Sequence, residues 1–156
     1  MAQLDGGDAQ IREYVKAAAD ATLLGRFDLV DITGAADTVA RSAAGGPFVG
    51  STLAAGAAST LTNQPTLIAS QRTVFEAQEN GNTGAASEGL NADVVVAAAV
   101  NGLSQMQINS ATAATTATLD SRLLAIAPYV GNAAGTNARW FVLLNDLRYG
   151  DLKAGV

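Results

Sequence analysis

The sequence predicts a mainly α-helical fold, and three features of the chain support that class. Apolar residues recur at helical spacing near both ends of the chain. A long stretch over 91–127 is rich in Ala, the residue with the highest intrinsic helix propensity. Only one short segment alternates apolar and acidic residues in the manner of a strand. We therefore expect a helical domain with one long Ala/Thr-rich helix, Gly/Ala-rich loops, at most a short strand pair, and a symmetric oligomer.

A single structural domain over residues 1–156 is expected, because the length suits one hydrophobic core. Its first part, 1–64, predicts a helix followed by an extended arm. Asp8 is a suitable N-cap for a helix from about 9 to 24. The following residues predict, in chain order, a short strand or arm, a short helix and a Gly/Ala/Ser/Thr-rich loop, over 27–33, 35–44 and 45–64.

The second part, 65–156, predicts the helical body. Pro65 can open a helix that extends to Gln78, and the Gly-rich residues 80–89 predict an exposed loop. Asn91 can cap the long helix, which Pro128 ends at 127. A last helix over about 137–150 contains Trp140 in the densest apolar run of the chain, so we expect it to anchor the core.

The long helix carries one candidate subunit interface. Its seam residues recur at alternating steps of four and three positions, and they are Val96, Val100, Leu103, Ala114, Ala117 and Leu124. Such a seam packs either within its own domain or between subunits around a symmetry axis. A helix of this length exceeds the diameter of a small domain, which is the argument for a contact between subunits, although packing within its own domain is the simpler interpretation.

A hairpin is the alternative for residues 94–109. Asn101-Gly102 stands between two apolar runs, and this dipeptide is the strongest short signal for a two-residue β-turn. Val94–Val100 and Leu103–Asn109 would then be paired strands. The sequence leaves both structures open, although the three alanines at 97–99 favour the helix.

Composition argues against a catalyst. The chain has no His and no Cys, which removes the most common general base and every thiolate chemistry.

Residues 45–52 have the spacing of a phosphate-binding loop, but Ser51 stands in place of the essential Lys. Ser87 lies in an incomplete nucleophile elbow that has no His to activate it. Glu76 and Glu79 have the spacing of a glycosidase-type carboxylate pair on one helix face, but a solvent-exposed face that carries both side chains is the simpler interpretation. We therefore expect no catalytic, cofactor-binding or metal-binding residues.

The expected partners are other proteins. Fourteen acidic residues against nine basic ones give a net charge of −5, which repels nucleic acid. No apolar run approaches the ~20 residues that span a bilayer, so no membrane contact is expected. The first eight residues contain no signal-peptide pattern, and this predicts synthesis in the cytoplasm.

The Gly/Ala/Thr-rich segment over 45–62 and the Thr/Ala stretch over 109–124 give the chain a distinctive texture. In that texture it resembles small virion proteins of tailed bacteriophages, such as head decoration proteins, head fibres and tail components. The resemblance implies a capsid or tail protein located in the virion. It implies assembly with copies of itself and with other structural proteins.

Two functions follow from these observations. The first is a structural subunit of a large protein assembly, a tailed-phage virion protein if the resemblance holds. The second is a soluble helical adaptor that engages a protein partner without forming a repeated lattice. A small residual possibility is a carboxylate enzyme, for which no single residue stands out. The oligomeric state separates the first two functions.

Overall fold

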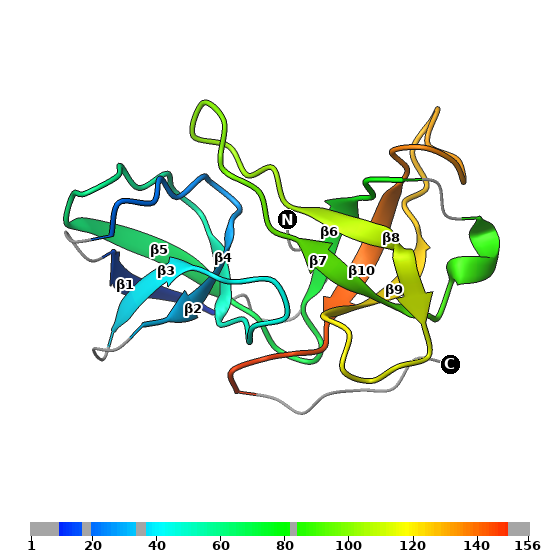
Figure 1. Ribbon diagram of the computed structural model, residues 1–156, viewed down its shortest axis with the longest axis horizontal. Coiled ribbons are helices and arrows are strands. Elements are labelled where there is room, and N and C mark those ends of the chain that lie inside the picture. Colours follow the sequence, from blue (N-terminus) through cyan, green and yellow to red (C-terminus); the bar gives the residue numbers. More distant parts are fainter. Residues whose placement is uncertain (1–9, 17–19, 34–36, 82–83, 150–156) are drawn as a thin grey trace.

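The computed structural model describes residues 10–16, 20–33, 37–81 and 84–149, and these residues form a β-protein. They contain ten strands and one short 3₁₀ helix, Ala85–Ser87. The strands form two groups that lie side by side (Figure 1). The predicted mainly α-helical class is therefore wrong, and the helices expected in both parts of the chain are strands.

The first five strands form a small closed barrel, which is drawn in blue to green in Figure 1. Around the barrel the order is β1-β3-β2-β4-β5, and β5 closes it against β1. The pairing of β1 with β3 is parallel and the other pairings are antiparallel. The strands are β1 (Ile11–Lys16), β2 (Leu29–Ile32), β3 (Thr38–Arg41), β4 (Gly50–Thr52) and β5 (Thr62–Ile68).

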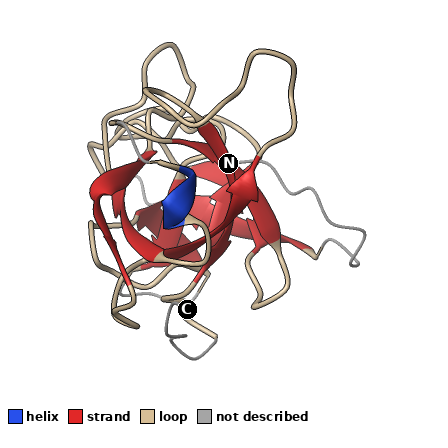
Figure 2. Ribbon diagram, turned by 90° about the vertical axis from the view of Figure 1, so that its right-hand side faces the viewer, coloured by secondary structure: helices blue, strands red, loops and turns tan. Residues whose placement is uncertain are grey.

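The other five strands form an antiparallel sheet in the order β6-β10-β9-β7-β8. Figure 2 shows how strongly this sheet curves. Its two edge strands meet at a bridge between Glu79 and Ile108, where the amide of Asn80 donates to the Ile108 carbonyl at 2.9 Å. The strands are β6 (Val74–Gln78), β7 (Asn91–Val95), β8 (Gln107–Ala114), β9 (Ser121–Ile126) and β10 (Arg139–Leu144).

The helices predicted in the first part of the chain are strands. The helix expected over 9–24 contains β1, with residues 9 and 17–19 outside the described part. The one expected over 35–44 contains β3, with 34–36 likewise outside. The strand expected over 27–33 is confirmed as β2. The loop predicted over 45–64 contains β4 and the beginning of β5.

Buried polar residues explain why these strands escape sequence analysis. The side chains of Lys16, Gln64 and Thr66 are buried, so apolar and polar residues do not alternate cleanly along β1 and β5. Hydrogen bonds make this burial tolerable. Lys16 Nζ donates to the Asp20 carbonyl at 2.7 Å, and Gln64 Nε2 donates to Thr62 Oγ1 at 2.9 Å.

The helices predicted in the second part are also strands. The helix starting at Pro65 is replaced by the end of β5 and by β6. The helix expected over 137–150 is β10 and the turns after it, with residue 150 outside the described part. Its role in the core is nevertheless confirmed, because Trp140 is fully buried.

The long helix over 91–127 is replaced by β7, β8 and β9 and their connections. The hairpin alternative is confirmed at its base, where Val94 pairs with Ile108 and Val95 pairs with Gln107, and at its tip, where Val100 pairs with Leu103. The residues between base and tip are not strand, so the predicted strands are too long. Helix propensities differ by less than about 1 kcal/mol per residue, so tertiary pairing readily overrides an Ala run. The many Val, Ile and Thr residues of this stretch suit a pleated strand better than a helix.

One hydrophobic core joins the barrel to the sheet. It includes Leu29, Phe48 and Leu67 from the barrel, together with Phe75 and Trp140 from the sheet. A smaller cluster, which includes the buried Tyr14, fills the barrel. The segment after β10 continues the connection, because the amide of Phe48 donates to the Asp146 carbonyl at 2.8 Å. The two groups of strands are thus held against each other by shared burial.

Candidate interaction surface

A hairpin arm, residues 96–106, connects β7 to β8 and projects from the molecule at the top of Figure 1. At its tip the amide of Val100 donates to the Leu103 carbonyl at 3.0 Å, and the reverse bond measures 2.9 Å. Asn101 and Gly102 between them have positive φ angles of 51° and 73°. This is the geometry of a type I′ turn, for which Asn-Gly is the preferred sequence.

The arm is packed against the barrel along one side. The amide of Arg26 donates to the Gly102 carbonyl at 2.7 Å, and the amide of Ser104 donates to the Arg26 carbonyl at 3.0 Å. Gly25 permits this approach, because a Cβ there would lie 2.7 Å from the Cβ of Ala99. The barrel therefore holds the arm in place, while Val100 and Leu103 stay 54% and 52% exposed at its tip.

A second exposed apolar element follows β9. Val130 is fully exposed, and Tyr129 beside it is partly exposed. The Tyr129 hydroxyl donates to Glu76 Oε2 at 2.8 Å, and its ring packs edge-on against Phe141 with ring centroids 6.5 Å apart. The hydrogen bond to Glu76 raises the pKa of Tyr129. Asn132 fixes the loop further by donating to the Ala127 carbonyl at 2.7 Å.

Two shallow hollows connect the arm to this loop. One of about 440 Å³ lies beside Leu103, and the other, of about 400 Å³, lies beside Val130. They share Gln78 and Arg139, so they are parts of one continuous surface. We call this surface the arm face, and its residues are Phe27, Gln78, Val100, Leu103, Tyr129, Val130 and Arg139.

The arm face carries little free charge. Arg139 Nη1 donates to Glu76 Oε1 at 3.3 Å, which neutralises the acidic group between the two hollows. The guanidinium of Arg26 lies 4.6 Å from the centre of the Phe27 ring. Large apolar and aromatic side chains that lie beside a paired Arg on fixed loops are common in protein–protein contacts.

The predicted interface residues do not form a single stripe, because they lie on different strands and turns. Val100 and Leu103 come together at the arm tip. Val96 packs against the core at the base of the arm. The remaining three are distributed over the end of β8, the following turn and β9, and they are Ala114, Ala117 and Leu124. The geometry of a helical seam is therefore wrong.

Sequence analysis missed the other residues of the arm face. Phe27 and Arg139 were assigned to a strand and a helix without a surface role. Tyr129 and Val130 follow Pro128 and precede Gly131, and large apolar residues in such a turn context were the available signal. Their proximity to the arm depends on strand order, which local patterns do not reveal.

The structure also places the residues considered for chemistry. Glu76 is half-buried within β6, whereas Glu79 is fully buried and accepts a hydrogen bond from Trp140 Nε1 at 3.2 Å. Their side chains lie in different environments, as expected for residues three apart along an extended chain. Ser51 and Thr52 of the loop with phosphate-binding spacing are buried in β4. The described residues contain no group of three or more potential metal ligands.

Comparison with protein-family models, curated proteins and solved structures finds no match. Nothing therefore identifies a phage protein family or supports a virion component, and the expected helical character is corrected to that of a β-protein. No helix in the described part of the chain is long and apolar enough to cross a membrane.

Proposed function

We propose that this chain is a non-catalytic subunit of a larger protein assembly, and that it binds a further copy of itself through the arm face. The observation that carries the proposal is the hairpin arm, whose apolar tip is exposed although its backbone is fixed on the barrel. Val100 and Leu103 are each about half exposed. Exposed apolar side chains on a preorganised backbone are a common feature of protein-binding surfaces.

The energy available supports a specific contact. Full burial of a Val or Leu side chain contributes about 1.5–3 kcal/mol, so completing the burial of a half-exposed one contributes about 1 kcal/mol. Val100, Leu103 and Val130 together would contribute several kcal/mol. Each 1.4 kcal/mol corresponds to a factor of about ten in affinity.

Leu103→Asp tests this proposal. Because Leu103 is half exposed, the isolated chain should lose only about 1 kcal/mol of stability. Self-association, measured by sedimentation and light scattering over a concentration series, should weaken at least about tenfold, because a charge enters an apolar contact.

Leu61→Asp is the matched control. Leu61 is also an exposed leucine, at 66%, but it precedes β5 in the barrel and lies outside the arm face. It should leave self-association unchanged. A wild-type chain that stays monomeric throughout the series would overturn the proposal and favour a monomeric adaptor. Equal effects of the two substitutions would place the contact elsewhere.

A further inference from the structure

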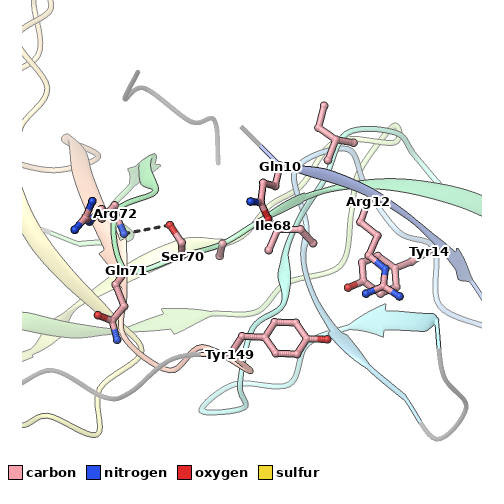
Figure 3. A pocket seen from close by; sticks show the side chains of 10 residues that line it. Gln10, Arg12, Tyr14, Ile68, Ser70, Gln71, Arg72 and Tyr149 are labelled. Atoms are coloured by element: carbon pink, nitrogen blue, oxygen red, sulfur yellow. Dashed lines mark hydrogen bonds between the residues drawn. The ribbon is translucent and has the colours of Figure 1, made fainter. Parts of the chain in front are cut away.

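A second concave site lies at the junction of the barrel and the sheet, apart from the arm face. It is a cleft of about 1070 Å³ bounded by β1, by the connection between β5 and β6, and by Tyr149 after β10 (Figure 3). Two of its large apolar side chains are well exposed, Ile11 at 57% and Tyr149 at 62%. Ile68 adds a partly buried apolar surface between them.

Hydrogen bonds give this cleft fixed walls. The amide of Ser70 donates to Thr73 Oγ1 at 3.0 Å, and the two hydroxyl groups are 2.9 Å apart. The Ser70 hydroxyl also accepts from the amide of Arg72 at 3.2 Å, which is the dashed line in Figure 3. On the opposite side, the amide of Arg148, next to Tyr149, donates to the Phe48 carbonyl at 2.9 Å.

The described lining of the cleft carries one unpaired cation, Arg72. Among the described residues the lining contains Arg12 and Arg72 and no acidic residue, whereas the chain carries a net charge of −5. Arg12 is held over the Tyr14 ring, 5.1 Å from its centre, and forms an ion pair with Asp37. Within the described residues Arg72 forms no ion pair, so its guanidinium is available to a ligand.

The two arginines are well separated. Figure 3 shows Arg72 and Arg12 at opposite ends of the cleft, with Ser70 and Ile68 between them. Tyr149 lies across from this row. An elongated site with an unpaired cation at one end and apolar groups along it suits an extended chain better than a compact ligand.

We propose that this cleft binds an extended acidic segment of a partner protein, with a carboxylate on the unpaired Arg72 and apolar side chains against Ile11, Ile68 and Tyr149. Arg pairs with carboxylates through two parallel hydrogen bonds, which gives the site both affinity and orientation. Aromatic and Arg residues are also those most enriched among strong contributors to protein binding. The inference is independent of self-association through the arm face.

A labelled peptide of sequence Asp-Leu-Thr-Leu-Asp, with both ends blocked, is a direct probe, and its binding is measured by fluorescence anisotropy. The peptide with Asn in place of both Asp is the uncharged comparison. We expect the acidic peptide to bind at least about tenfold more tightly than the Asn peptide, with affinity that falls as salt is added.

Variants assign the binding to the cleft. Arg72→Glu should weaken binding at least about tenfold, and Ile11→Ser, at an exposed position, should weaken it by about three- to fivefold through lost apolar contact. Arg26→Glu is the matched control, since it makes the same change of charge at an exposed arginine outside the cleft. It should change the affinity by less than about twofold.

The proposal is overturned if the acidic and Asn peptides bind equally, if neither binds, or if Arg26→Glu is as damaging as Arg72→Glu. Tighter binding of a short single-stranded oligonucleotide of matched charge would also overturn it, because the cleft would then be a general anion site. Thermal unfolding of each variant shows that the fold is retained, and the exposed Ile11→Ser variant keeps the test valid if an arginine variant fails to fold.

Discussion

Gly25→Ala tests the packing of the hairpin arm against the barrel. The added Cβ would lie 2.7 Å from the Cβ of Ala99, 2.7 Å from the carbonyl carbon of Leu103 and 2.8 Å from the amide nitrogen of Ser104. Two of these neighbours are backbone atoms, which cannot rotate away. The arm must therefore separate from the barrel, or the barrel must deform.

The expected cost follows from the contacts that would be lost. Separation breaks the two backbone hydrogen bonds between Arg26 and the arm, each contributing about 1 kcal/mol. Overpacking adds about 1–3 kcal/mol. We expect a loss of about 3–5 kcal/mol, a substantial part of the 5–15 kcal/mol that stabilises a typical domain.

Urea unfolding gives the total loss, and hydrogen exchange at the amides of Arg26 and Ser104 shows whether the arm separates locally. Gly84→Ala is the matched control, because a Cβ at Gly84 would meet nothing closer than 4.0 Å and its φ of −74° suits alanine. The control should be neutral or slightly stabilising. Equal stability of Gly25→Ala and wild type, with unchanged exchange, would refute the packing described here.

Two further predictions concern buried positions. Burial is the main cause that raises the pKa of Asp120 in the folded chain above its ordinary value of 3.8. The stability that the Asp120 carboxyl contributes is therefore greatest below pH 3.8, and it is lost as pH rises through the folded-state pKa. Asp120→Asn, which keeps an acceptor for the amide of Val94, should flatten the dependence of the urea midpoint on pH between about pH 4 and pH 7; an unchanged slope would show that Asp120 does not titrate in this range. Gly50→Ala places a Cβ 1.9 Å from the Leu67 carbonyl oxygen and should cost at least about 3 kcal/mol in the same assay, whereas a wild-type midpoint would show that β4 and β5 are not in close contact.

Local turn chemistry was the most informative part of the sequence. Asn101-Gly102 indicated the hairpin alternative whose turn is the arm tip, since few other residue pairs tolerate two successive positive φ angles. The apolar run around Trp140 predicted a core element. Both signals depend on a few neighbouring residues. They therefore stay valid even where the surrounding helices and strands are assigned incorrectly.

Strand order and the candidate interface could not be predicted in the same way. Arg26 meets Leu103, and Phe48 meets Leu147, across long separations in sequence. No local period encodes such pairs. In β8 an irregular register, in which Asn91 pairs with Ala114 but Asp93 pairs with Asn109, further hides the alternation expected of a strand.

The abundance of small residues has a different meaning in this fold from the one that composition suggests. About one residue in five is Ala, and in isolation this favours helix. Here the small residues let backbones approach, because Gly102 lies against Ala55 and Gly25 lies against Ala99. The residues that pack the arm against the barrel thus contribute little apolar area. The larger apolar side chains of the arm tip, such as Val100, are exposed. Intramolecular packing therefore fixes the position of the arm without using its apolar tip, and that tip is the part of the arm that a second copy can bury.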